Sequence, residues 1–356
     1  MKQIFRPGAV ALALTMPALS AFADGAPQGV ATPQSHAPIG VMGDHMHKKG
    51  EFMASLRHMD MRMKGNLKGS NKLSDAAVLS EPNANGMFDG LRVVPQEMDM
   101  RMTMLGVMYA PSDTVTLLAM FMHHDTKMKL TTYQGMMGTS VLGDFETESS
   151  GTGDTVVGAL FAGGEKANGK WHYGLALSLP TGATDKTDHV LTPANMRPRK
   201  RLPYPMQLGS GSYELKPSLT YNGDWAGWRI GAQAAAVLRL NDNDDDYRLG
   251  DKVQLQGWAM KNLAAWASAS VRLDVNHQGT MDGKDPLIAL PVPTAQTRSH
   301  GGTFASAAFG VNLIGRSGAL AGHRLALEWV KPIYQHAEGV QMKRQETLML
   351  GWQKAF

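Results

Sequence analysis

Methionine recurs at every second position in two short stretches of the chain. The sequence HMDMRMKG occupies residues 58–65, and its core MDMRM returns unchanged at 98–102. A thioether packs adaptably against apolar groups and also binds soft metal ions such as Cu(I). Alternate residues of a β-strand point to the same side, so this spacing places the thioethers on one strand face. The chemistry is therefore either soft apolar packing or soft-metal binding.

Histidine adds imidazole donors to the methionines. His45, Met46 and His47 lie together in GDHMHKKG (43–50), and His124 lies further along the chain. These four residues are the candidate ligands for copper or another soft metal. Sulfur atoms two residues apart on a strand are about 7 Å apart, so they could share one ion only with help from a neighbouring strand. An adaptable lining without metal stays open as the other interpretation.

The amino terminus has the pattern of a secretory leader. Lys2 and Arg6 precede an apolar run over residues 9–19, and Ala21-Phe22-Ala23 matches a small-residue cleavage site. The run is too short for a transmembrane helix, which needs ~20 residues. The expected organisation is a leader (1–23), a periplasmic segment containing His and Met (24–49), which could also hang into a lumen, and an outer-membrane domain (50–356).

Composition narrows the possible partners. The chain has no cysteine, so an exported form must be stable without disulfides. Without Lys2 and Arg6 the formal charge falls from +4 to +2, because 33 basic residues then face 31 acidic ones. This excess is too small to indicate nucleic-acid binding.

Alternation with period two dominates from residue 50 onward. In AWASASVRLDVN (265–276), one parity is wholly apolar and the other mostly polar, and WRIGAQAAAVLRL (228–240) repeats the scheme. Strands with two such faces separate two different solvents. The two segments are 12 and 13 residues long, above the ~5–6 residues usual in globular sheets and sufficient for a membrane strand of ~9–11 residues.

Short turns alternate with long loops along the chain, which is typical of an outer-membrane barrel. The sequence therefore predicts an all-β fold, a transmembrane antiparallel β-barrel of about twelve strands with short periplasmic turns and longer extracellular loops. The predicted strands are 50–64, 94–109, 115–130, 154–163, 170–180, 212–221, 228–240, 247–258, 264–276, 303–314, 323–334 and 342–356.

The last strand carries an additional signal. Leu348, Leu350, Trp352 and the terminal Phe356 share one parity. A terminal Phe on an amphipathic strand resembles the signal by which barrel assembly machinery recognises its substrates for membrane insertion. Closure of the barrel is required because lipid cannot satisfy an open sheet edge.

Arg57 sets the orientation of the first strand. It lies near the middle of the span, where a lipid-facing arginine would cost ~2–4 kcal/mol. Arg57 must therefore point inward, together with the methionines of the same parity. The candidate lumen-lining residues are Arg57, Met59, Met61, Met98, Met100, Met102, Met120, Met122, Arg229, Arg239, Arg272, Asp274 and Glu328.

This orientation turns charged residues outward near the long-loop ends of the first strands. Asp60, Arg62, Asp99 and Arg101 are among them. We expect these ends to lie above the hydrocarbon, among lipid headgroups. In the opposite arrangement the methionines face lipid and the charges line the lumen.

Two charged runs fall in predicted external loops. NDNDDD (241–246) resembles part of a calcium loop but lacks the required glycine and closing glutamate. RPRKR (197–201) is basic and could meet lipopolysaccharide phosphates. Both are expected as solvated loop tips, with lipopolysaccharide contact as the alternative.

A lipid-modifying barrel enzyme is a further alternative. It would need a nucleophile and a base at one interface. Ser268, Ser270 and Ser306 have inward parity, and His277 and His323 lie near in sequence, but no spacing links them and no G-x-S-x-G occurs.

Several stretches resemble a known outer-membrane family. They are GVMYAPSD (106–113), LSLPTG (177–182) and RLPYPMQLGSGSYELKPSLTY (201–221). The chain is similar to the group named for phenol meta-pathway degradation, whose members are often labelled transporters. The resemblance implies a barrel that passes small, aromatic or apolar solutes, and it supplies no catalytic residues.

The resulting expectation is a passive channel in the bacterial outer membrane, with lipid, lipopolysaccharide and a small solute as partners. Copper or another soft metal handled by the methionine and histidine rows is the main alternative, and no other cofactor is expected. No nucleotide-binding motif implies energy coupling.

Overall fold

The computed structural model describes residues 32–86, 89–166 and 169–356, which form one compact unit from Thr32 to Phe356. The predicted leader over 1–23 lies outside the described residues, as do residues 24–31 of the segment that follows it. Among the described residues, no helix has both the length and the apolar character needed to cross a bilayer.

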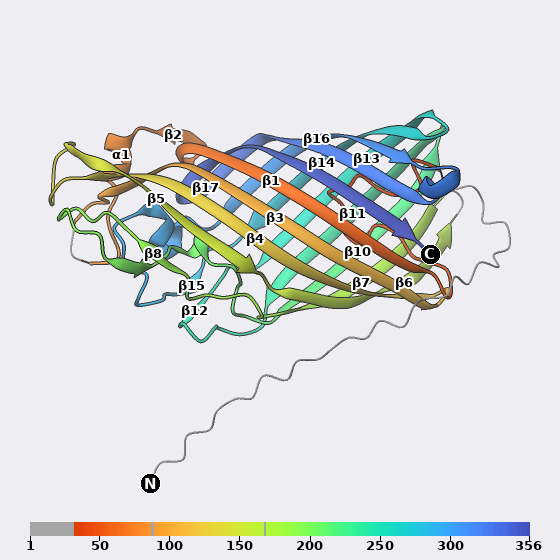
Figure 1. Ribbon diagram of the computed structural model, residues 1–356, viewed down its shortest axis with the longest axis horizontal. Coiled ribbons are helices and arrows are strands. Elements are labelled where there is room, and N and C mark those ends of the chain that lie inside the picture. Colours follow the sequence, from red (N-terminus) through yellow and green to blue (C-terminus); the bar gives the residue numbers. More distant parts are fainter. Residues whose placement is uncertain (1–31, 87–88, 167–168) are drawn as a thin grey trace, which may run out of the picture. The chain divides into compact units, whose positions relative to one another are not determined.

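The described strands form a closed antiparallel barrel (Figure 1). The strands of its wall are β1 (Phe52–Gly69), β3 (Val93–Ser112), β4 (Val115–Tyr133), β6 (Thr155–Lys166), β7 (Gly169–Leu179), β10 (Glu214–Trp225), β11 (Trp228–Arg239), β13 (Lys252–Ala264), β14 (Ala267–Gln278), β16 (Gly302–Ile314) and β17 (His323–Ala355). Neighbours in this order pair with one another, and β17 pairs with β1 to close the ring.

Strand β17 crosses the wall twice. Residues 324–337 pair with β16, whereas residues 337–355 pair with β1. Trp352 Nε1 donates to His323 Nδ1, and Gln335 hydrogen-bonds the backbone of Arg344, so the two halves run antiparallel. Gly339 lies at the turn with φ +67°, a conformation that favours glycine. Eleven labelled strands of the described chain thus make twelve crossings, which confirms the predicted barrel.

The sequence alternation explains the two faces of the wall. Exposed outward side chains are apolar at mid-strand and aromatic toward the short-turn end, as the lipid and its interface require. The apolar ones include Leu56, Leu105, Leu175, Leu255, Leu273, Val311, Leu327 and Leu350, and the aromatic ones include Phe52, Tyr109, Trp171, Trp225, Trp266 and Phe356.

One side of the barrel is taller than the rest. Strand β3 has 20 residues, or roughly 66 Å of extended chain and about 47 Å of height when tilted by ~45°, whereas the apolar band of such barrels is ~25 Å tall. β5 (Val141–Thr152) pairs with the upper half of β4 on this side. Outward ion pairs such as Arg62–Asp99 and Lys64–Glu97 join these extensions. Their position agrees with the expectation that the charged ends lie above the hydrocarbon.

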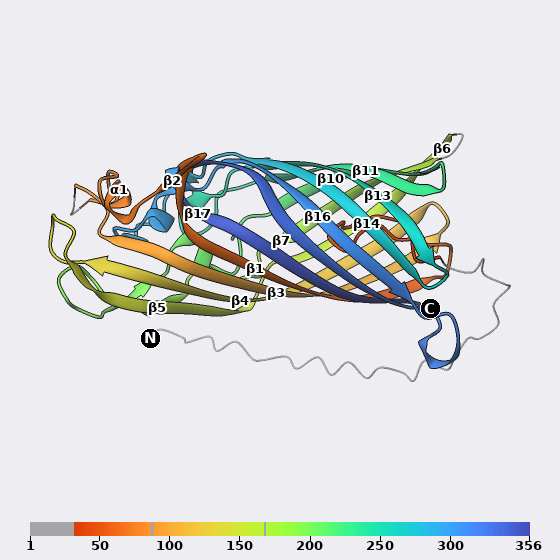
Figure 2. The ribbon, with the colours of Figure 1, turned by 90° about the horizontal axis from the view of Figure 1, so that it is seen from above.

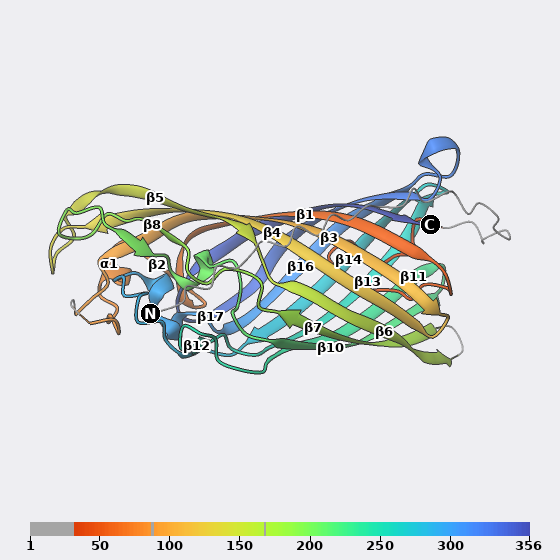
Figure 3. The same ribbon diagram turned by 60° about the horizontal axis from the view of Figure 1, so that its bottom comes forward.

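The long loops fold over one end of the barrel, as the turned views make clear (Figures 2 and 3). The remaining strands are β2 (Asn71–Leu73), β8 (Thr187–His189), β9 (Arg199–Arg201), β12 (Tyr247–Arg248) and β15 (Asp282–Gly283), and the helical turns are α1 (Asp75–Leu79), η1 (Tyr204–Met206), η2 (Pro293–Ala295), η3 (Thr297–Ser299) and η4 (Gly318–Leu320). β8 pairs with β9 within one loop, whereas the pairing of β12 with β15 joins two loops that are distant in sequence.

Candidate functional site: a plugged and capped lumen

The inner face of the barrel wall is polar over β10 to β17. Arg272 is 4% exposed and forms an ion pair with Glu328, with Nε 2.9 Å from Oε1. Asp274 is buried above this pair and accepts hydrogen bonds from Gln254 and Asn276. The parity argument placed all three charged residues inward, and their burial agrees with it.

The amino-terminal segment fills the short-turn end of the lumen. We call residues 32–49 the plug. Arg57 Nη1 donates to the carbonyl oxygens of Ile39 and Val41, at 3.0 and 3.1 Å. From strand β11 of the wall, Gln233 Nε2 donates to the carbonyl oxygen of Met42. The sequence left both the periplasm and the lumen open for this segment, and these hydrogen bonds place residues 32–49 in the lumen.

Gly40 fits the plug against the ion pair on the wall. Its backbone N–H donates to Glu328 Oε2 at 2.8 Å. A Cβ at this position would lie 2.4 Å from both Arg272 Nη2 and Glu328 Oε2. A larger residue at this position would therefore have to displace the Arg272–Glu328 pair or push the plug backbone away from the wall.

The methionine rows of β1, β3 and β4 form one continuous stripe inside the barrel, which we call the methionine track. Antiparallel pairing sets methionines directly opposite one another, with Cβ atoms about 4.5–5.5 Å apart. The opposed pairs are Met53–Met108, Met59–Met102, Met61–Met100, Met63–Met98, Met104–Met122 and Met98–Met128. Met120 faces Gly106 on the same side. Thioethers of neighbouring strands are thus close together, as two sulfur atoms would have to be to share one metal ion.

A cavity of about 310 Å³ lies between the plug and the barrel wall. Its apolar side is part of the methionine track, and its other side carries hydrogen-bonding groups. The track side includes Met53, Met104, Met108, Met120, Met122 and Leu118, and the polar side includes Arg57, Lys216, Gln233, Gln254 and Gln256.

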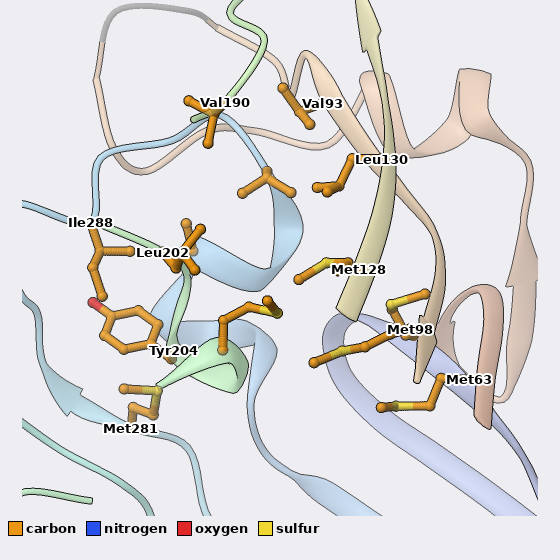
Figure 4. Packing of buried hydrophobic residues seen from close by; sticks show 14 of the residues in the cluster. Met63, Val93, Met98, Met128, Leu130, Val190, Leu202, Tyr204, Met281 and Ile288 are labelled. Atoms are coloured by element: carbon orange, nitrogen blue, oxygen red, sulfur yellow. The ribbon is translucent and has the colours of Figure 1, made fainter. Parts of the chain in front are cut away.

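The outer end of the track packs under the long loops. We call this buried cluster the outer cap. It consists of Met63, Val93, Met98, Met128, Leu130, Val190, Leu202, Tyr204, Met206, Tyr247, Met281, Ile288, Val292, Ala295 and Met342. Figure 4 shows Met63, Met98 and Met128 from the wall beside Leu202, Tyr204 and Met281 from the loops. Met61 and Met100 pack against the cap from below, so it is continuous with the track.

Three loops of the cap meet where one arginine contacts two carboxylates. Arg201 Nη1 lies 2.5 Å from Asp245 Oδ1 and 2.6 Å from Asp285 Oδ2. Asp285 is only 2% exposed. The runs RPRKR and NDNDDD were expected as solvated tips, and for Arg201 and Asp245 that is wrong. Charge complementarity between the two runs was the sequence signal that could have suggested this pairing.

Tyr204 of the outer cap packs against a buried histidine. The rings of Tyr204 and His300 meet edge to face with centroids 5.3 Å apart. His300 Nε2 lies 3.1 Å from the carbonyl oxygen of Thr294. Burial lowers the pKa of His300 to about 4, so the ring is neutral at neutral pH.

Two basic side chains lie on the inner wall at the polar side of the cavity. Arg239 Nε and Lys216 Nζ each lie 3.0 Å from a carboxylate oxygen of Glu214. Two cations thus share one anion, which leaves a local positive charge opposite the methionine track. Arg229, also predicted to line the lumen, instead pairs with the exposed Asp224 at the short-turn rim.

The predicted metal ligands do not gather as a set. His45 and His47 lie in the plug, where their ring centroids are 4.7 Å apart. The backbone N–H of His47 bonds Thr116, and His124 lies eight positions along the same strand, about 26 Å away. His124 therefore belongs to another part of the lumen. Met46 of the plug is half-buried.

His36, another histidine of the amino-terminal segment, completes the plug cluster. His36 approaches His45 with ring centroids 4.3 Å apart, and Asp44 Oδ1 lies 3.0 Å from His45 Nδ1. Burial lowers the pKa of His36 well below its ordinary value, and burial with the adjacent His45 lowers that of His47 to about 4. Burial alone would raise the pKa of Asp44, but His45, His36 and Arg324 hold it well below its usual range.

The residues considered for an enzyme are not brought together. His277 is exposed on the outer face, where its Nδ1 lies 2.9 Å from Thr303 Oγ1. Ser306 pairs with Pro332, nine positions or about 30 Å along the strand from His323. Ser268 and Ser270 are buried on the inner face, where Ser268 Oγ accepts a hydrogen bond from Asn312.

The carboxy-terminal strand lies in the wall as its parity predicts. Leu348 and Leu350 are exposed on the outer face, and Trp352 is half-buried. The ring of Phe356 lies 6.1 Å from that of Phe52. Its role in membrane insertion stays a prediction.

A closed barrel with a lipid-facing band, short turns at one end and capping loops at the other defines an outer-membrane β-barrel. The model of the family described as a MetA pathway of phenol degradation matches residues 103–285, just over half of the 356-residue chain, and the chain belongs to this family.

Comparison with solved structures supports the fold. An outer-membrane channel from Pseudomonas putida F1 is 16% identical, with 89% of this chain and 99% of that chain covered and a TM-score of 0.57. The Ralstonia pickettii toluene transporter TbuX is 12% identical over 87% and 90% of the chains, with a TM-score of 0.43. The latter similarity is too distant to bear on function. No curated protein matches the chain significantly.

Proposed function

We propose that the protein is a passive outer-membrane channel for small apolar or aromatic solutes. Membership of a family named for phenol degradation supports this function, as does the structural similarity to an outer-membrane channel from Pseudomonas putida. The sequence contains no nucleotide-binding motif that would suggest energy coupling.

The observation that carries the proposal is the continuity of the methionine track. It runs from Met63 and Met98 in the outer cap to Met53 and Met108 beside the plug. All methionines of the track are on the inner face of the wall. Thioether side chains are flexible and adapt their shape to different apolar surfaces. A solute leaving the cap would therefore find apolar contacts along the whole descent to the cavity.

The size and polarity of the cavity favour a small amphipathic solute. Its volume of about 310 Å³ exceeds the ~150 Å³ that holds benzene in an apolar cavity. Lys216 and the glutamines of the opposite side would hydrogen-bond a polar group. Because Glu214 is shared by Lys216 and Arg239, an acidic head such as a carboxylate or phenolate would be preferred over a cationic one.

Both ends of the path must open for passage. The outer cap would open when the loops that Arg201 holds together move apart. The plug would move when its backbone is released from Arg57. Neither set of contacts is part of the strand pairing, so each end can move without disturbing the barrel wall.

Proteoliposome uptake of benzoate and of a neutral sugar of similar mass tests the proposal. We expect faster benzoate uptake by the wild-type protein and a loss of that preference in Met104→Asp/Met120→Asp. Met136→Asp/Met137→Asp is the matched control, because both of these methionines are exposed outside the lumen, at 65% and 86%. Equal uptake of both solutes, or an unchanged preference in the lumen variant, would contradict the proposal.

A further inference from the structure

Three side chains of the plug converge on one point. His36, Asp44 and His45 each present a ligand atom, and these atoms all lie within 4.8 Å of one another. Asp44 Oδ1 is 3.0 Å from His45 Nδ1. The cluster lies inside the barrel, since Asp44 also accepts the backbone N–H of Ala37 and its carbonyl accepts Asn222 Nδ2 from β10.

Two imidazole nitrogens of this cluster are buried without a protein partner. Within the described part of the chain, His36 Nδ1 and His45 Nε2 accept or donate no hydrogen bond, whereas His45 Nδ1 pairs with Asp44. Buried polar atoms almost always have a partner, because leaving one unsatisfied is unfavourable. Two such atoms beside one buried carboxylate point to a ligand that they share.

We propose that His36, Asp44 and His45 bind a divalent transition-metal ion, with Zn²⁺ and Cu²⁺ as the ions that match their donors. Two imidazole nitrogens and one carboxylate oxygen are a common protein donor set for these ions. Tetrahedral coordination with bonds of ~2.0–2.1 Å places two ligand atoms about 3.4 Å apart. Ligand atoms separated by up to 4.8 Å would therefore have to approach one another by up to about 1.4 Å, through side-chain rotation, when the ion binds.

A further histidine and a further carboxylate lie beside the cluster, and Arg324 is a cation close to it. His47 lies beside His45, its side chain is 4% exposed, and its Nε2 is buried without a partner among the described residues. Glu51 Oε2 lies 3.3 Å from His47 Nδ1, which orients the ring and adds negative charge nearby. Carboxylates commonly orient histidines in this way around metal ions.

The donor set differs from the one that the sequence suggested. The alternative interpretation of the sequence combined thioethers and imidazoles around a soft ion such as Cu(I), but Met42 Sδ contacts Arg57 Nη1 at 2.6 Å instead of the cluster. The nitrogen and oxygen donors favour a divalent ion over Cu(I). The ion would link residue 36 to residues 44 and 45 and so hold in shape the plug loop that contacts Arg57 and Glu328. Passage of solutes through the methionine track does not require this site, so the inference goes beyond the proposed function.

Metal binding to the mature protein in detergent tests the site. After removal of metal by a chelator, we expect calorimetric titration with Zn²⁺ or Cu²⁺ to give one equivalent per chain. His36→Ala/His45→Ala should abolish it, and Asp44→Asn, which can still accept the Ala37 N–H, should weaken it by about tenfold or more. His123→Ala and His277→Ala, both exposed on the outer face, should bind as the wild type does.

A spectroscopic readout makes the test independent of affinity. Electron paramagnetic resonance of the Cu²⁺ form should show coupling to at least two imidazole nitrogens in the wild type, and this coupling should be lost in His36→Ala/His45→Ala. Heat-modifiable electrophoretic mobility would establish that each variant is a folded barrel. The proposal is overturned if the wild type binds no equivalent of either ion, or if the folded double variant retains it with unchanged affinity and spectrum.

Discussion

Arg57 on β1 and Ile39 of the plug are joined by a hydrogen bond of 3.0 Å from the guanidinium Nη1 to the backbone carbonyl oxygen. The same nitrogen donates to the carbonyl of Val41 at 3.1 Å. A buried wall cation thus holds the plug by its backbone, independently of the side chains that the plug carries. This arrangement makes the docking of the plug testable by a single substitution.

Arg57→Met should release the plug and raise the single-channel conductance. Hydrogen bonds to charged groups contribute about 1.5–3 kcal/mol each, so loss of two should lower the ratio of docked to released plug at least tenfold. Planar-bilayer recording measures the effect. Arg62→Met is the matched control on the same strand, because Arg62 is outward and its side chain is 63% exposed. Wild-type conductance in Arg57→Met would show that Arg57 does not hold the plug.

Arg201→Ala should loosen the outer cap while leaving the barrel folded. It would leave Asp285, which is 2% exposed, buried without its counter-charge. Breaking one partner of such a pair costs up to about 3–5 kcal/mol. We expect faster proteolysis within residues 183–211 and 279–300, with Arg199→Ala as the exposed control. Restored resistance in Arg201→Ala/Asp285→Ala would support the charge explanation, whereas unchanged proteolysis of Arg201→Ala would refute it.

Acidification should also loosen the cap, through His300. Burial lowers its pKa from 6.5 to about 4, so the loosened state binds more protons between these values. The contribution of the neutral ring to cap stability is therefore complete above pH 6.5 and falls as pH drops toward 4. Proteolysis of the cap loops should quicken over this window. His300→Phe should remove this pH dependence, and a pH response unchanged in that variant would assign it to other groups.

Leu273→Arg should destabilise the membrane domain. Leu273 lies mid-strand on the outer face and is 59% exposed, toward lipid in a membrane. An arginine near the midplane costs ~2–4 kcal/mol, against ~0–1 near the interface. Reversible unfolding from phospholipid vesicles measures the difference. Glu146→Arg, on the charged upper part of β5, is the control, and an equal cost at both positions would contradict the assigned hydrocarbon band.

Local patterns carried much of the prediction of the wall. Strand alternation predicted β11 to within one residue and β14 to within three residues at each end, since strand parity depends only on which solvent each face meets. β5 was missed within an expected loop over 131–153, because VLGDFETESSGT is polar on both faces and lies above the membrane. Without a lipid-facing row, its sequence lacks the alternation that marks the other strands.

The sequence by itself determined the closed barrel, its orientation and the inward parity of Arg57 and the methionines. Those follow from the cost of placing charge or an open sheet edge in lipid, which acts on each strand separately. Only the tertiary structure decided that residues 32–49 fill the lumen, that Arg201 joins Asp245 and Asp285, and that His36 meets Asp44 and His45. Such contacts join residues that are far apart in the chain, and they depend on how the loops fold back across the barrel. No periodicity in the sequence indicates which of these residues will meet.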